Sequence, residues 1–174
     1  LIIRKTLENF KINKGIEVVT IADIPSSGSG LGSSSTLTVG LTKALYEFQK
    51  RKINKKKLSS EASNIEINKC KKPIGMQDHY AAAYGGFNSI LFKQNKTVSV
   101  NKVKISNSRL SNFKSHLIMF YSGINRKADK ILGKIKKEKN ENTHYEKLSI
   151  LAKNFEYELT KGNLLNLGHI LNEN

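Results

Sequence analysis

The sequence has few of the residues that cross-link small domains or build metal clusters. Its 174 residues include one cysteine, two prolines, no tryptophan and three aspartates. A single cysteine, Cys70, can form neither an internal disulfide bond nor a cysteine-based zinc site. We therefore expect a cytoplasmic protein whose core is stabilised by apolar packing.

Long hydrophobic runs are also missing. A membrane-spanning helix needs about 18 consecutive apolar residues, and the richest short run here is HLIMFY at 116–121. We therefore expect no membrane partner. The chain starts at Leu1 without an initiator methionine and ends without a helix stop signal. We expect it to be a piece of a longer protein, in which a leader could precede Leu1.

Acidic residues are scarce relative to basic ones, and the formal net charge is +16. Such a balance favours nucleic acid, anionic membranes or phosphorylated small molecules as partners. No zinc-finger spacing, RNP-type aromatic motif or basic heptad helix accompanies the lysines. We interpret the charge mainly as a solvated basic surface, with phosphate-bearing ligands and nucleic acid as the alternatives.

The apolar periodicity predicts a chain of mixed helices and strands, of the α+β or mixed α/β class. Helices are expected at 3–12, 33–50, 59–68 (capped by Ser59 or Ser60), 76–84, 126–137, 143–160 and from 163 onward. Strands are expected at 16–23, 87–92, 97–105 in two short runs, and 116–121.

A glycine- and serine-rich stretch, IPSSGSGLGSSST at 24–36, joins the first predicted strand to a helix. The first turn of a helix has backbone N–H groups without partners and a partial positive charge. Glycines let the backbone approach a ligand closely, and serine hydroxyls add donors. Together these features make an anion cradle that suits phosphate.

Two standard phosphate-binding motifs do not fit this stretch. A Walker loop requires a lysine after its last glycine, and none follows Gly32. A dinucleotide fingerprint has the spacing G-x-G-x-x-G, whereas the glycines here are Gly28, Gly30 and Gly32. A plain turn into a serine-capped helix remains the alternative interpretation.

Phosphoryl transfer needs a metal ion on the phosphates and a group that acts on the attacking hydroxyl, and carboxylates can supply both. Asp78 lies in the first turn of a short predicted helix, and Glu66 stands twelve residues earlier at the edge of an apolar stripe. The simpler alternatives are a helix-capping aspartate and a solvated glutamate.

The stretch PSSGSGLGSSST resembles the ATP-binding signature of the GHMP kinases, approximately P-x-x-x-G-L-G-S-S-[AS]. The resemblance implies that ATP and Mg²⁺ are the cofactors. It implies that Asp78 acts on the acceptor hydroxyl and that Ser34 and Glu66 ligate Mg²⁺. The implied nucleotide-binding residues are Gly28, Ser29, Gly30, Leu31, Gly32, Ser33, Ser34 and Ser35.

Within that family, PIGMQDHYAAAYGGFNSI and FYSGINRKADKIL most resemble the D-glycero-D-manno-heptose 7-phosphate kinases. His79 stands where those relatives often have Gln. The resemblance implies ATP-dependent phosphorylation of the anomeric hydroxyl of the heptose phosphate, giving the 1,7-bisphosphate. Gln77 and Arg126 are the candidate substrate contacts, and the implied partners are ATP and a sugar phosphate.

The implied fold is α+β, with an N-terminal ATP-binding domain like ribosomal protein S5 domain 2 over 1–115. The start of a helical or α+β C-terminal domain is expected over 116–174. The family's first strand and its glycine-rich third motif are not found in this sequence.

Other functions remain open at this point. A GHMP kinase for another sugar such as fucose has the same motifs, and a basic S5-like fold could hold nucleic acid without catalysis, which we favour less. A kinase fragment that needs its remaining parts or a partner chain is a third alternative, and a homo-oligomer is left open. The four histidines lack metal-ligand spacing, and we interpret them as structural; His79 adjoins Asp78.

Overall fold

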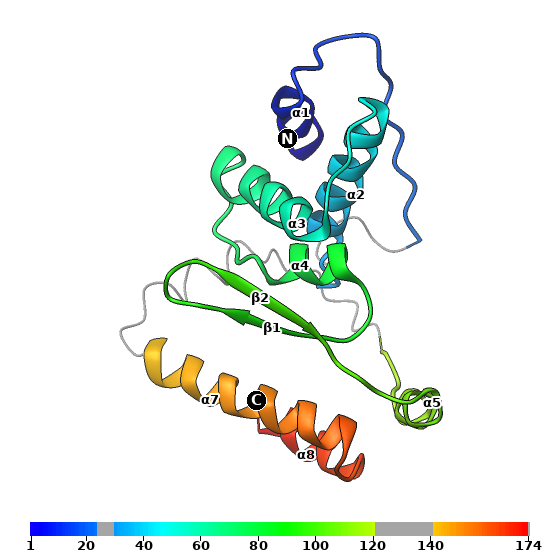
Figure 1. The fold of residues 1–174 in the computed structure, drawn as a ribbon, viewed down its shortest axis with the longest axis vertical. Helices are drawn as coiled ribbons and strands as arrows, with labels where there is room; N and C mark the ends of the chain where they lie inside the picture. The colour runs from blue at the N-terminus through cyan, green and yellow to red at the C-terminus, as the bar shows by residue number, and fades with distance from the viewer. Residues whose placement is uncertain (24–29, 121–140, 174) are drawn as a thin grey trace. The chain divides into compact units, whose positions relative to one another are not determined.

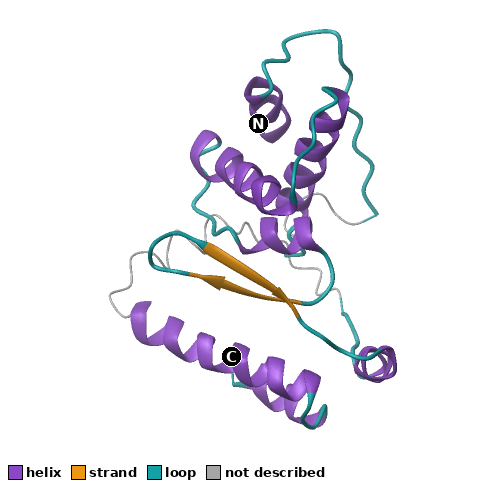
Figure 2. Cartoon of the chain, in the orientation of Figure 1, coloured by secondary structure: helices purple, strands orange, loops and turns teal. Residues whose placement is uncertain are grey.

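The computed structural model describes residues 1–23, 30–120 and 141–173 (Figure 1). In these residues the chain forms two compact units, and each is considered separately. The described part of the first unit comprises residues 1–23 and 30–86, and that of the second comprises 87–120 and 141–173. Helices dominate both units, and the second also has a hairpin of two strands (Figure 2).

The first unit is built from helices that pack on α2. Its elements are α1 (Ile2–Asn9), α2 (Ser33–Phe48), α3 (Lys55–Asn64), the π-helix η1 (Ile65–Lys69) and α4 (Gln77–Tyr84). Helix α4 packs against both α2 and α3, and α1 packs against α2 and η1. The predicted helices in this region are therefore confirmed, with shifted ends.

Two apolar clusters hold these helices together. The first contains Phe10, Leu41, Leu45 and Tyr46. The rings of Phe10 and Tyr46 meet edge to face with their centroids 5.1 Å apart, an arrangement that aromatic pairs prefer. The second cluster, where α4 joins the core, contains Val39, Leu58 and Ala62, with Ala82 and Ala83 packed against it.

The strand predicted at 16–23 is wrong, because those residues form no strand. Ile16 and Val18 pack against the first cluster, whereas Val19 and Ile21 are 74% and 92% exposed. No strand in the described part of the chain pairs with this segment. The β-branched composition suits a pleated surface, but a strand also needs a partner for its hydrogen bonds.

The helix predicted from Ser59 begins four residues earlier, and the predicted Ser59 or Ser60 cap is wrong. The side chain of Asn54 accepts a hydrogen bond from the Lys57 amide at 2.8 Å, which is the usual role of an N-cap. Ser59 instead donates to the Lys55 carbonyl. The preceding segment KRKINKKK at 50–57 is rich in lysine, a good helix former, and its last three residues open the helix.

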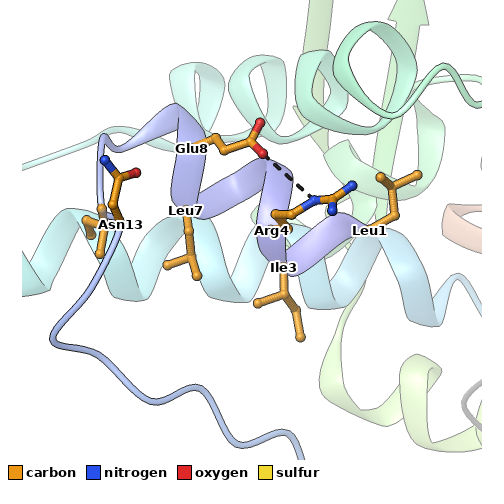
Figure 3. A pocket seen from close by; sticks show the side chains of 7 residues that line it. Leu1, Ile3, Arg4, Leu7, Glu8 and Asn13 are labelled. Atoms are coloured by element: carbon orange, nitrogen blue, oxygen red, sulfur yellow. Dashed lines mark ion pairs between the residues drawn. The ribbon is translucent and has the colours of Figure 1, made fainter.

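A hollow of about 530 Å³ lies along α1 in the first unit (Figure 3). Arg4 and Glu8 form an ion pair at its side, with Nε and Oε1 3.8 Å apart. The lining residues are Leu1, Ile3, Arg4, Leu7, Glu8, Ile12 and Asn13. None of them is a residue that the sequence predicts for nucleotide, metal or substrate, so this hollow is not the candidate site.

The described part of the second unit contains an antiparallel hairpin and three helices. Its elements are β1 (Asn88–Phe92), β2 (Val98–Lys102), α5 (Asn107–Ser115), α7 (Glu141–Thr160) and α8 (Leu165–Asn172). Ile90 pairs with Val100 at the centre of the hairpin. The core contains Val103, Phe113, Leu159 and Leu167, so it joins all three helices.

Arg109 closes the end of α7. Its guanidinium donates to the backbone carbonyls of Glu158, Leu159 and Gly162. Glu158 and Leu159 lie in the last turn of α7, where backbone carbonyls have no partner within the helix, and Gly162 follows the helix.

Some predictions for this unit are corrected and others are not tested. Residues 116–120 form no strand, and Ile118, Met119 and Phe120 are each at least 78% exposed. Helix α5 was not predicted, because Leu110 and Phe113 give too short an apolar pattern; the Ser106 side chain caps it. The helix predicted at 126–137 lies outside the described residues.

None of the described helices could span a membrane.

The packing of α2 predicts a contrast between two substitutions on that helix. Leu45 is 2% exposed, whereas Phe48 is 62% exposed. We expect Leu45→Ala to lower the free energy of unfolding by about 2–5 kcal/mol through lost contacts and a cavity. Phe48→Ala, the matched control, should change it by less than about 0.5 kcal/mol. Urea unfolding followed by circular dichroism measures both, and equal losses would contradict this packing.

Candidate active site

The N-terminus of α2 is the structural centre of the candidate site. Gly32 is its N-cap, in the left-handed conformation with φ of 65°, and provides no side-chain cap. Gly30 also has positive φ, at 72°. The backbone amides at the start of α2, which an N-cap side chain would otherwise cover, can therefore receive an anion. Gly28 and Ser29 lie outside the described residues.

Asp78 reaches this helix end from α4. It lies in the first turn of α4, and its carboxyl group lies directly against Gly32. A Cβ atom added at Gly32 would be 3.4 Å from both Cγ and Oδ2 of Asp78. The Asp78 side chain is therefore beside the phosphate cradle that the sequence predicted.

Glu66 lies on the π-helix η1, and its side chain is 0% exposed. Its Oε1 accepts from Lys72 Nζ at 2.8 Å, and its Oε2 lies 2.8 Å from His79 Nε2. Thr38 Oγ1 donates to Oε2 at 3.2 Å, and Ser34 also hydrogen-bonds to the carboxylate. The alternative of a solvated surface glutamate is therefore excluded. Short π-helical segments such as η1 are frequent at functional sites.

The hydrogen bonds keep Glu66 ionised although it is buried. Burial raises the pKa of Glu66, but hydrogen bonds from His79, Lys72 and Ser34 outweigh burial and lower it from 4.5 to about 2. A carboxylate that accepts several donors is stabilised in its charged form. The site therefore contains a permanent negative charge next to the first turns of α2.

The structure brings four of the predicted site residues to one end of α2. Ser34 and Glu66 are hydrogen-bonded to each other, and Asp78 lies against Gly32. Gln77, a predicted substrate contact, is exposed. Its side chain lies so close to Gly75 that a Cβ atom there would clash with it. The other predicted contact, Arg126, lies outside the described residues.

The residues present fit a magnesium ion in their donor chemistry. Ser34 and Glu66 supply hard oxygen ligands, which Mg²⁺ prefers, and Mg²⁺ often takes its other ligands from water and phosphates. Lys72 Nζ is a cation already placed on Glu66 Oε1, at 2.8 Å. Glu66 would therefore meet a metal directly only if Lys72 moved away. Among the described residues, no group of three or more His, Cys, Asp or Glu side chains could hold a metal ion.

Sequence reasoning did not find the partners of Glu66. His79 was interpreted as structural, although its place next to Asp78 was a signal. Lys72 lies among many surface lysines, so nothing in the sequence separates it from them. Thr38 lies one turn after Ser34 on α2, and this helical spacing could have placed it next to the same ligand.

The N-terminal part of the chain matches a known protein family. Residues 1–86 match the sequence profile of the GHMP kinases N terminal domain. Residues 1–86 are a GHMP kinase N-terminal domain. The expected α+β fold with such a domain is confirmed, whereas the predicted boundary between 115 and 116 stays a prediction.

Known relatives of the chain include heptose phosphate kinases. Over 112 residues it is 39% identical to the D-glycero-alpha-D-manno-heptose 7-phosphate kinase of Campylobacter jejuni, covering 64% of this chain and 33% of the relative. A crystal structure of a D-glycero-D-manno-heptose 1-phosphate kinase from Bacteriodes thetaiotaomicron superposes with a TM-score of 0.78 at 27% identity, covering 98% of this chain and 52% of that one.

A candidate sugar kinase from Campylobacter jejuni superposes with a TM-score of 0.65 at 32% identity, covering 87% of this chain and 42% of that one. The chain thus spans about half or less of the lengths of these relatives. These GHMP kinase homologues are sugar kinases, which are phosphotransferases.

The backbone of the GHMP kinase domain at Gly32 predicts a contrast between two glycines. Gly32 has φ of 65° and a Cβ atom there would lie 3.4 Å from Asp78, whereas Gly40 lies within α2 with open space at its Cβ position. Gly32→Ala should lower the free energy of unfolding by about 1–2 kcal/mol, because a Cβ is strained in this conformation. Gly40→Ala, the control, should raise it by about 0.5–1 kcal/mol. Urea unfolding tests both, and a stabilising Gly32→Ala would contradict the assigned backbone.

The lowered pKa of Glu66 predicts a pH-dependent contribution to stability. A carboxyl whose pKa is lowered on folding stabilises the fold above its unfolded value, here 4.5, and this contribution is lost as the pH falls toward 2. Glu66→Gln should therefore cost about 3 kcal/mol at neutral pH, because it breaks a buried ion pair. The difference from wild type should narrow between pH 5 and pH 2.

Glu47→Gln is the control for this measurement, because Glu47 forms an exposed pair with Lys43 on α2. It should change stability little at any pH. Unfolding curves in urea across this pH range give the comparison. A Glu66→Gln penalty that does not depend on pH would contradict the assignment.

Proposed function

We propose that the protein is an ATP-dependent sugar kinase that phosphorylates the anomeric hydroxyl of D-glycero-D-manno-heptose 7-phosphate to give the 1,7-bisphosphate. One observation carries the proposal: the Asp78 carboxylate lies against Gly32, at the N-terminus of the helix that suits a phosphate. The 39% identity to a heptose 7-phosphate kinase supports the substrate class.

In this proposal the nucleotide's phosphates bind at the first amides of α2, where the helix dipole favours negative charge. Ser34 and Glu66 would hold Mg²⁺, which neutralises charge on the phosphates during transfer. The sugar hydroxyl oxygen attacks the terminal phosphorus of ATP, and the bond from this phosphorus to the bridging oxygen breaks, so ADP leaves. Asp78 accepts the hydroxyl proton and returns it to solvent, to which it is exposed.

The excess of basic residues is compatible with these substrates. Both ATP and a sugar phosphate are anions, and a net charge of +16 attracts anions over distances of about a Debye length. This charge does not choose the sugar, and the solved relative is named for a heptose 1-phosphate. An assay with both heptose phosphates therefore has to decide which of them is the substrate.

The proposed role of Asp78 predicts a selective loss of catalysis. In the complete natural protein, Asp78→Asn should lower kcat by about 100-fold or more, because the proton acceptor is removed. ATP binding, measured by calorimetry, should survive. Glu47→Gln on the exposed side of α2 is the control. Turnover retained in Asp78→Asn would remove Asp78 from the mechanism.

The proposed substrate is tested with a panel of sugars. Wild-type protein is incubated with ATP and heptose 7-phosphate, heptose 1-phosphate or fucose, and the products are identified by phosphorus NMR. We expect the 1,7-bisphosphate from heptose 7-phosphate at the highest kcat/KM. A faster reaction with fucose would overturn the substrate and keep the kinase, whereas no transfer to any sugar would overturn both.

A further inference from the structure

His79 connects the two acidic residues of the site. It follows Asp78 directly on α4 and is completely buried. Its Nε2 lies 2.8 Å from Oε2 of Glu66. Because an ionised carboxylate can only accept hydrogen bonds, Nε2 carries the proton and donates it. The other ring nitrogen, Nδ1, is buried without a hydrogen-bond partner in the described part of the chain.

We propose that His79 is a positioning residue, which ties the first turn of α4 to Glu66 and so holds the Asp78 carboxylate beside Gly32. The inference rests on the proposed function, because it gives Asp78 a catalytic role. In this role His79 does more than fill the core, and it does not need to contact the substrate.

Helix α4 needs such a tie at the end that carries Asp78. It has eight residues, and Met76 at its N-cap provides no side-chain hydrogen bond. So short a helix is marginal by itself. Its other end is held by Lys55 Nζ, which donates to the Tyr84 carbonyl at 2.9 Å, and by Ala82 and Ala83 in the second apolar cluster. His79 supplies a fixed polar contact in the first turn.

The geometry of a helix explains how one side chain sets the direction of the next. Successive residues of an α-helix are rotated by about 100° around its axis. When the ring of His79 is held on Glu66, the direction of the Asp78 side chain is fixed as well. Glu66 is in turn held by Thr38 on α2, whose Oγ1 lies 3.2 Å from its Oε2. The chain of contacts therefore runs from α2 through Glu66 and α4 back to Gly32.

Two polar substitutions separate this role from simple core filling. The amide nitrogen of a glutamine can take the place of Nε2 and donate to Glu66. The amide of an asparagine is one carbon shorter and falls near the place of Nδ1, which has no described partner. His79→Gln should therefore keep the contact, and His79→Asn should lose it.

The experiment measures kcat and the KM for ATP in the complete natural protein, with heptose 7-phosphate as acceptor and values corrected for the folded fraction. His79→Asn should lower kcat by about tenfold or more, since a small displacement of a catalytic group has large effects on rate. The KM for ATP should change little. His79→Gln should keep most of the wild-type kcat. His116→Asn, at an exposed histidine of α5's C-cap, is the control.

Three results would overturn the proposal. One is a wild-type kcat in folded His79→Asn, and another is an equal tenfold loss in both variants. The third applies if His79→Asn does not fold: a tenfold loss of kcat in His79→Gln would then overturn the proposal by itself.

Wild-type protein that transfers phosphate to no sugar would instead defeat the proposed function. Hydrogen exchange of the first turn of α4 then decides the positioning role separately. Faster exchange in His79→Asn than in His79→Gln supports it, and unchanged exchange in His79→Asn overturns it.

Discussion

The arrangement of the first unit depends on one buried charge. Glu66 has no exposed surface, and a carboxylate without partners in such a place would cost several kcal/mol. Its partners come from three parts of the chain: Thr38 on α2, Lys72 after η1 and His79 on α4. Because each contact compensates the same buried charge, these segments keep a fixed arrangement around it. The apolar clusters bring the helices together, and the charge determines their orientation.

This constraint explains how Glu66 of η1 and Asp78 of α4 both come to the N-terminal part of α2. The proposed phosphate cradle belongs to α2 alone, which has positive φ at Gly32 and helix amides with no side-chain cap. Asp78 is brought to it by α4, and α4 is packed on α2 and α3. A kinase site needs both a place for phosphate and a carboxylate at its edge. In the proposed site the two come from α2 and α4, which pack directly against each other.

Much of this was predictable from the sequence. The helix at Ser33, the positive φ of Gly30 and Gly32 and the short helix at Asp78 follow from local patterns, because caps and periodicity are local. The strand expected at 16–23 failed because strand formation depends on a partner that local composition does not reveal. The partners of Glu66 were missed for a similar reason: Lys72 and His79 become special only when packing excludes water around them. Local patterns predicted the helices that carry Ser34 and Asp78, and tertiary packing decides which contacts hold these side chains.

The π-helix adds a consequence for how this segment can vary among natural sequences. The Cys70 amide bonds to the Ile65 carbonyl across five residues, one more than in an α-helix. Removing a single residue here would restore α-helical winding and swing Glu66 away from the interior. Exchanging a side chain on the outer side of this turn would leave the winding unchanged, whereas a change in its residue count would move Glu66. An aligned homologue with a one-residue gap between 65 and 69 would be expected to have lost the buried acid as well.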